Sequence, residues 1–119
     1  MGSLVCKFGG TSVATAAQVR KVEAIIRTDS RRRFIVPSAP GKRDSSDKKI
    51  TDLLYTCHQL AEQGLSFAEP FQIIRDRYLE LARELDVTVP LDNELDEIEA
   101  RLKNGASRAA CFKRGCRPP

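Results

Sequence analysis

The feature that most restricts the fold of this chain is its shortage of strand patterns, with two short candidates in 119 residues. The first is the apolar start at residues 4–8, and the second is the β-prone run at residues 34–36, which Pro37 breaks. Between them, apolar residues recur at helical spacing over residues 19–26. This strand–helix–strand order predicts parallel, neighbouring strands joined by a crossover.

The second half of the chain has helical periodicity in three successive segments. We expect the first of them to end near Gly64, the second to hold Pro70 in its first turn, and the third to run from a cap at Asp92 to Asn104-Gly105. We expect these helices to pack together through their apolar positions. Those positions are Ile50, Leu53, Leu54, Cys57, Leu60 and Ala61, then Phe67, Phe71, Ile74, Tyr78, Leu81, Ala82 and Leu85, then Leu91, Leu95, Ile98 and Leu102.

A parallel pair of strands makes a poor independent core, because its edges and much of its surface stay exposed. The predicted fold is therefore unfinished. We expect a fragment, a truncated product or a chain that needs a partner to cover its sheet, with marginal stability or self-association as the symptom. The ending KRGCRPP, at residues 113–119, has no apolar period and is expected to be disordered.

The composition is that of a soluble globular domain, with 41% hydrophobic and 30% charged residues. No apolar run reaches the roughly 20 residues that span a bilayer, and the start lacks a signal-peptide pattern, so we expect a cytoplasmic chain without a membrane partner. The net charge of +4 lies in short basic clusters without neighbouring aromatic residues. That pattern favours small anions over nucleic acid.

Cysteine and histidine spacing argues against a structural metal site. The chain has four cysteines and one histidine, His58, without a CxxC pair. Cys6 lies in a strand pattern and Cys57 on an apolar helix face, so we expect both to be small buried side chains. We expect His58 to be partly buried rather than catalytic, and we assign no metal ligand.

The turn after the first strand has the layout of a phosphate-binding site. Lys7 and Gly9-Gly10 precede Thr11 and Ser12, and glycine lets backbone N–H groups approach phosphate oxygens closely. The hydroxyl groups of Thr11 and Ser12 suit the cap of the first helix, whose N-terminus favours an anion. The alternative is a capped helix without a ligand, and the spacing alone does not separate the two.

The identities of the residues in this segment are more specific than the spacing of its glycines. The segment VCKFGGTS at residues 5–12 resembles the N-terminal signature of aspartokinases, in the amino-acid kinase family, and lacks the ending of a Walker P-loop. The segments FIVPSAPGKR at 34–43 and KITDLLY at 49–55 are similar to that family's second strand, substrate loop and following helix. The resemblance implies an α/β fold: the N-terminal portion of a three-layer α/β/α sandwich, helix-rich after two parallel strands.

The resemblance also suggests a domain boundary. It covers residues 3 to about 108, which implies a partial amino-acid kinase domain at 1–108 and an atypical basic tail at 109–119 that we expect to be disordered. A frameshift or early stop would explain the change, and we hold that as a hypothesis that the DNA after the Arg108 codon tests. Cys116 stands where the family's Arg-Gly-Glu motif has a glutamate that holds substrate, and a thiol does not replace a carboxylate in that role.

Aspartokinases transfer the γ-phosphoryl group of ATP, with Mg²⁺, to the side-chain carboxylate of L-aspartate, the first step of lysine, threonine and methionine synthesis. The resemblance therefore implies an ATP-dependent kinase with L-aspartate and MgATP as partners. It implies that Lys7 is catalytic through its charge and that Ser38 and Thr51 hydrogen-bond the amino acid. The ATP- and phosphate-binding residues that it implies are Lys7, Phe8, Gly9, Gly10, Thr11 and Ser12.

Alternatives remain beside this interpretation. Ser38 and Thr51 are also suited to ordinary turns and caps. The basic residues Lys42, Arg43, Lys48 and Lys49 could draw anions into the site, although a solvated basic loop is the favoured description. The chain could instead be a catalytically incompetent remnant that binds phosphate or nucleotide, and it could form a homo-oligomer or associate with a full-length subunit. Aspartate-dependent ATP turnover would distinguish an active kinase from such a remnant. A small nucleic-acid binder is a third reading, tested by salt-sensitive retention of DNA or RNA.

The main structural expectation is a single cluster. Because parallel strands end at the same edge of a sheet, Lys7 and Gly9-Gly10 should lie near Ser38 and Thr51 at the carboxyl ends of the two strands. Separation of these groups would remove the mechanistic interpretation.

Overall fold

The computed structural model of the chain describes the course of residues 2–113, with side chains described up to residue 105. The chain divides into compact units at Met1–Thr51 and Asp52–Pro119, called here the first and second units. No helix in the described range is both long and apolar enough to cross a membrane.

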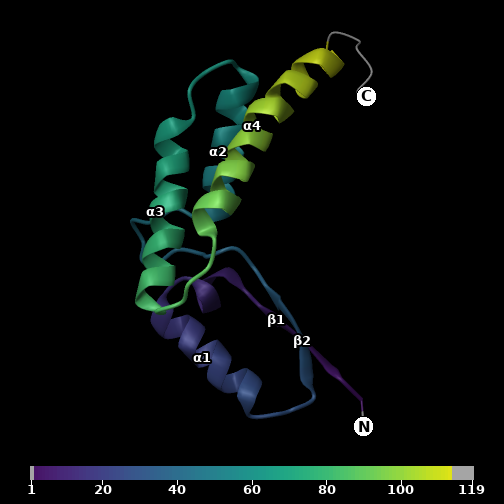
Figure 1. Ribbon diagram of the computed structural model, residues 1–119, viewed down its shortest axis with the longest axis vertical. Helices are drawn as coiled ribbons and strands as arrows, with labels where there is room; N and C mark the ends of the chain where they lie inside the picture. The colour runs from purple at the N-terminus through teal and green to yellow at the C-terminus, as the bar shows by residue number, and fades with distance from the viewer. Residues whose placement is uncertain (1, 114–119) are drawn as a thin grey trace. The chain divides into compact units, whose positions relative to one another are not determined.

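The first unit is built on a parallel pair of strands. Strands β1 (Leu4–Phe8) and β2 (Arg32–Pro37) are hydrogen-bonded neighbours, and helix α1 (Ala16–Arg27) lies between them in sequence (Figure 1). The register places Phe8 opposite Pro37, so both strands end at the same edge. The predicted strand–helix–strand unit is confirmed, and Pro37 closes the second strand as its last residue rather than breaking it.

Much of the apolar surface of this sheet is exposed. Val5 and Phe34 are partners in the register and are 70% and 57% exposed, and Val36, the partner of Lys7, is 48% exposed. Partners in neighbouring strands, and residues two apart on one strand, project from the same face. The expectation that two strands leave an apolar face uncovered is confirmed.

The turn after β1 differs from the prediction. It forms a short 3₁₀ helix, η1 (Gly10–Val13), and α1 begins only after a separate cap. That cap is Thr15, whose hydroxyl oxygen accepts a hydrogen bond from the Gln18 backbone N–H at 3.2 Å. The prediction that Thr11 and Ser12 cap the first α-helix is therefore wrong, because both residues lie in η1.

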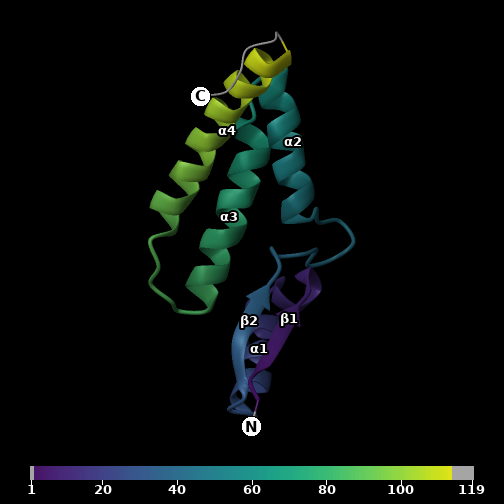
Figure 2. The same ribbon diagram turned by 90° about the vertical axis from the view of Figure 1, so that its right-hand side faces the viewer.

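The rest of the chain is helical. The helices are α2 (Ile50–Glu62), α3 (Ala68–Glu84) and α4 (Leu91–Lys113). In both views α2 and α3 run side by side (Figure 2), and α3 and α4 pack against each other. The rings of Phe67 and Phe71 meet edge to face, with centroids 6.3 Å apart. The prediction for the apolar stripes holds in part. The predicted positions that are buried include Leu53, Cys57, Phe67, Phe71, Ile74 and Leu95. Most of the other predicted positions are half-buried, and Ile98 is exposed.

The end of α2 follows the sequence closely. Gly64 has a φ of 72°, in the left-handed region that favours glycine, and the Leu65 N–H donates to the Leu60 carbonyl oxygen at 2.9 Å. This is the hydrogen bond of a Schellman-type helix end. The predicted stop near Gly64 is confirmed, and Pro70 lies in the first turn of α3 as expected.

Helix α4 is longer than predicted. It begins at Leu91, so Asp92 is in its first turn rather than at its cap, and it continues through Asn104-Gly105 to Lys113. One glycine costs a helix interior only about 1 kcal/mol. Ion pairs at i,i+4 spacing, such as Arg101 with Glu97 at 2.6 Å, also favour the helix before that point.

The expected tail overlaps this helix. Residues 109–113 continue the backbone of α4, whereas the sequence assigns them to a disordered tail. Residues 114–119, with Cys116 in the altered Arg-Gly motif, lie outside the described residues. The proposed boundary between 108 and 109 stays a prediction.

The expectations for the cysteines and the histidine are met in part. Cys57 is fully buried, and burial raises the pKa of its thiol, whereas Cys6 is only half-buried. His58 is exposed rather than partly buried, with its Nε2 3.4 Å from a Glu62 carboxylate oxygen. It faces solvent because it lies one residue along α2 from the buried Cys57.

Candidate functional site

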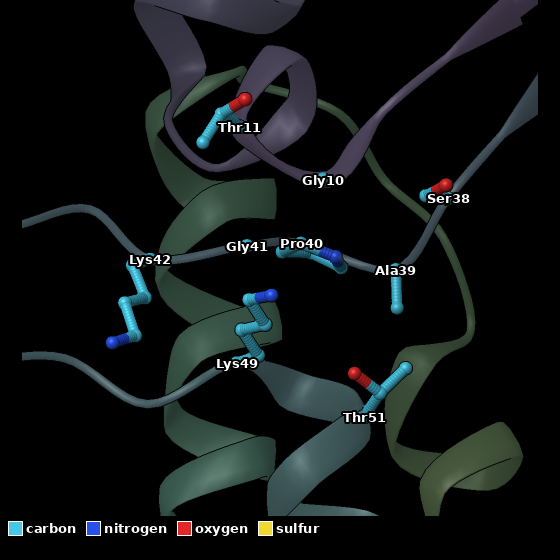
Figure 3. A pocket seen from close by; sticks show the side chains of 9 residues that line it. All are labelled: Gly10, Thr11, Ser38, Ala39, Pro40, Gly41, Lys42, Lys49 and Thr51. Atoms are coloured by element: carbon cyan, nitrogen blue, oxygen red, sulfur yellow. The ribbon is translucent and has the colours of Figure 1, made fainter.

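A pocket of about 390 Å³ lies in the first unit, beyond the ends of the two strands (Figure 3). Its walls come from the start of η1, from the loop between β2 and α2, and from the first turn of α2. The lining residues are Gly10, Thr11, Ser38, Ala39, Pro40, Gly41, Lys42, Lys49 and Thr51.

Backbone hydrogen bonds hold the loop in place around this pocket. The Ser38 N–H donates to the Phe8 carbonyl oxygen at 2.9 Å, which extends the pairing of β1 and β2 by one residue. At the other end of the wall, the Ile50 N–H donates to the Pro40 carbonyl oxygen at 3.3 Å. The loop is thus tied both to the sheet and to the start of α2.

The tightest contact in the pocket wall joins two glycines. The Gly41 N–H donates to the Gly10 carbonyl oxygen at 2.8 Å. A Cβ atom on Gly41 would lie 2.8 Å from the Gly10 carbonyl carbon and 2.9 Å from the Thr11 nitrogen. Contacts this short are not tolerated between a Cβ atom and backbone, so the approach requires glycine at position 41.

The pocket contains half of the residues expected at the site. The structure brings Gly10 and Thr11 together with Ser38 and Thr51, from three separate segments, as the parallel strand order predicts. The other expected residues, Lys7, Phe8, Gly9 and Ser12, belong to the same strand and turn but do not line the pocket. Lys7 is exposed on the sheet opposite Val36. The roles assigned to all eight residues remain predictions.

The lining also contains charged residues, for which the sequence favours a different description. Lys42 and Lys49 line the pocket, although the sequence alone favours a solvated basic loop for them. Neither lysine forms an ion pair with any of the residues that the structure describes. The available signal was their position, since Lys42 directly follows Gly41 and Lys49 directly precedes the first turn of α2.

Other charged residues of the loop form ion pairs or hydrogen bonds with neighbours within the loop. Arg43 binds Asp47, with its Nε 2.7 Å from Oδ2 and its Nη2 3.1 Å from Oδ1. Asp44 accepts hydrogen bonds from the Ser46 hydroxyl at 2.6 Å and from its backbone N–H at 2.9 Å, and these lower the pKa of Asp44. Both pairs brace the loop between Lys42 and Lys49.

The chemistry of the lining is one-sided. Among the described lining residues there are two with ammonium groups and three with hydroxyl groups, and none with a carboxylate. Such a set donates hydrogen bonds and offers positive charge, so it suits an oxyanion such as a phosphate or a carboxylate. It has no carboxylate to hold a divalent metal ion.

The sequence has clear relatives among curated proteins, although no family profile matches it. It is 44% identical over 86 residues to Aspartokinase 3 of Bacillus subtilis, an alignment covering 70% of this chain and 18% of the relative. It is 33% identical over 90 residues to an aspartokinase of Chlamydia muridarum and 39% identical over 89 residues to one of Chlamydia trachomatis, covering 75% and 74% of this chain.

The fold agrees with a solved aspartate kinase. The structure superposes on the Clostridium acetobutylicum enzyme with a TM-score of 0.85 and 39% identity, over 94% of this chain and 26% of that one. Most of this chain is homologous to part of an aspartokinase.

The aspartokinase resemblance carried by the two motifs is therefore confirmed, and so is the α/β fold class. The chain spans 18% of the length of the curated aspartokinases that it matches.

Proposed function

We propose that this chain supplies part of the substrate site of an aspartate kinase, which transfers the γ-phosphoryl group of ATP to the side-chain carboxylate of L-aspartate. The observation that carries the proposal is the meeting of the Gly10 turn with Ser38 and Thr51 at one pocket. In a chain homologous to aspartokinases, these are the residues that the family resemblance assigns to phosphate and to the amino acid.

The donor-rich lining supports the nucleotide part of the proposal. Phosphoryl transfer depends on alignment of the acceptor with the γ-phosphate and on positive charge near its oxygens. In the proposal, Gly9 and Gly10 present backbone N–H groups to the phosphates, Thr11 adds its side-chain hydroxyl group, and Lys7 near the end of β1 adds its charge. Phe8 and Ser12 shape the same turn. The proposed Mg²⁺ is held by the nucleotide and by groups outside this lining, which has no carboxylate.

The hydroxyl groups on the other wall support the amino-acid part. Ser38 directly follows β2 and Thr51 lies in the first turn of α2. In the proposal they hydrogen-bond L-aspartate and point its side-chain carboxylate toward the phosphates. No residue of the lining is assigned as a general base, because the attacking carboxylate is already ionised at neutral pH.

The proposal extends to the pathway, the cellular location and the association of the chain. The reaction would be the first step of lysine, threonine and methionine synthesis, in the cytoplasm. The exposed apolar face around Val5 and Phe34 is consistent with association with a second copy or with a full-length kinase subunit.

The direct test is formation of aspartyl phosphate, trapped with hydroxylamine, by the purified chain with saturating MgATP. Aspartate-dependent hydroxamate that Lys7→Ala abolishes is the expected result. Product that does not depend on aspartate, or that survives Lys7→Ala, contradicts the proposed chemistry. No product from a folded sample that binds both substrates would restrict the role of this chain to binding.

A further inference from the structure

Two lysines of the loop between β2 and α2, Lys42 and Lys49, line the pocket. We infer that Lys49, with Lys42 as a second cation in the same lining, forms a cationic subsite for an oxyanion of a substrate, either a carboxylate group of the amino acid or a phosphate group of the nucleotide. The inference rests on the proposed function, and it assigns a binding role to two residues to which the family resemblance gives no contact.

The distribution of charge supports this subsite. Arg43 is neutralised by Asp47, with contacts of 2.7 and 3.1 Å. Lys48 and Lys7 do not line the pocket. The positive charge at the pocket therefore comes from Lys42 and Lys49, and within the described part of the chain neither is offset by a carboxylate. An anion that enters the pocket meets a net positive field.

The backbone fixes where these lysines start. Lys42 follows Gly41, whose N–H donates a hydrogen bond to the Gly10 carbonyl oxygen. Lys49 precedes Ile50, whose N–H donates to the Pro40 carbonyl oxygen. These hydrogen bonds hold both parts of the loop at one pocket. Figure 3 shows the Lys49 side chain extending toward the Pro40–Gly41 segment, with the Thr51 hydroxyl turned toward the same space.

Lys49 is the better placed of the two for contact with a ligand. In Figure 3 its ammonium group lies amid the lining residues, whereas the Lys42 ammonium group points to the side. A lysine ammonium has three donors and acts as a point charge, so it suits either kind of oxyanion. Loss of such a contact at a partly exposed site should weaken binding roughly tenfold or more.

The test is calorimetric titration of the full 119-residue chain at low ionic strength. Two probes separate the two sources of oxyanion: L-aspartate for the carboxylate and inorganic tripolyphosphate for the nucleotide phosphates. Lys49→Gln should weaken one of them roughly tenfold, and Lys49→Arg should keep most of the affinity because it keeps the charge. The matched control is Lys48→Gln, which removes the same charge one residue away and should change affinity less than about twofold.

The outcomes distinguish the subsite from the proposed function. If Lys49→Gln weakens neither probe more than Lys48→Gln does, while Thr51→Val still weakens binding, the subsite is overturned and the proposed function stands. If Lys49→Arg binds as poorly as Lys49→Gln in a folded sample, charge is not the cause and the inference fails. If the unsubstituted chain binds neither probe, the inference and the proposed function fail together.

Discussion

Gly41 and Gly10 are in direct backbone contact, with the Gly41 N–H 2.8 Å from the Gly10 carbonyl oxygen. The contact joins the loop after β2 to the turn after β1. Both glycines line the pocket, so the pocket depends on this approach.

Replacement of Gly41 should therefore damage the first unit. Gly41→Ala places a Cβ atom 2.8 Å from the Gly10 carbonyl carbon, and we expect it to lower the free energy of unfolding by about 1–3 kcal/mol. The matched control is Gly9→Ala, where the new Cβ atom meets nothing within 4 Å and φ is −72°. It should change stability by less than about 1 kcal/mol. Urea unfolding checks both variants, and equal losses would contradict the assigned contact.

Thr15 and Thr11 should separate stability from binding. Thr15→Ala removes the cap of α1 and should cost about 1 kcal/mol of unfolding free energy, without changing the affinity of the folded chain for tripolyphosphate. Thr11→Ala should do the reverse, because Thr11 lines the pocket and does not cap α1. Thermal unfolding and calorimetry on both variants measure the two effects. Loss of the same property in both variants would show that the assignment of the cap is wrong.

An arginine network should hold α3 to α4. Arg75 is 16% exposed, and its guanidinium lies 3.1 Å from Asp92 and 2.6 Å from Asp96, with its carbon 5.7 Å from the centroid of the Phe71 ring. Arg75→Met should lower stability by about 1–2 kcal/mol, and the loss should shrink at high salt. Arg83→Met is the control.

The Arg83 side chain is 75% exposed, and its ion pair with Glu80 is long, at 4.0 Å. Its replacement should change the free energy of unfolding by less than about 0.5 kcal/mol. Denaturant melts of the two variants at low and high salt make the comparison. A salt-independent loss in Arg75→Met would mean that packing, and not charge, dominates at that residue.

Asp29 should make the chain sensitive to acid. Hydrogen bonds from the Arg31 side chain and backbone lower the pKa of Asp29 from 3.8 to about 2. Because the pKa is lower in the folded chain, this contribution to stability is complete above about pH 4, falls as the pH drops toward 2, and is absent below that. Carbon-13 titration of the carboxyl group should show a pKa near 2 that Arg31→Gln raises and Arg33→Gln does not. A value near 3.8 in the unsubstituted chain would contradict the contact.

Local patterns in the sequence predict much of this fold. The helical period marks α1 to α4, and glycine marks the end of α2, because hydrophobic spacing and backbone freedom act within a few residues. Thr15 was missed as a cap because three hydroxyl residues precede α1 at different distances, and only the three-dimensional turn selects one. The extension of α4 past Gly105 was missed because a single glycine is a weak stop signal.

The site was predicted less completely than the fold. Ser38 and Thr51 were predicted from the resemblance to the aspartokinase segments, because an isolated serine or threonine carries no signal of its own. The roles of Gly41 and Lys49 depend on contacts between segments about thirty residues apart, as between Gly41 and Gly10, and no local period reports such contacts. Lysines in a polar loop look alike in sequence, and only the folded loop shows that Lys42 and Lys49 line the pocket whereas Lys48 does not.

Amide chemical shifts of the folded chain, recorded while MgATP and then L-aspartate are added, test the central claim most directly. We predict that the Gly10 and Thr11 signals respond to MgATP and that the Ser38 and Thr51 signals respond to L-aspartate, while α3 signals such as that of Arg83 stay in place. Shifts confined to the second unit, or no shift with either substrate in a folded sample, would contradict the assignment of this pocket as a part of an aspartate kinase site.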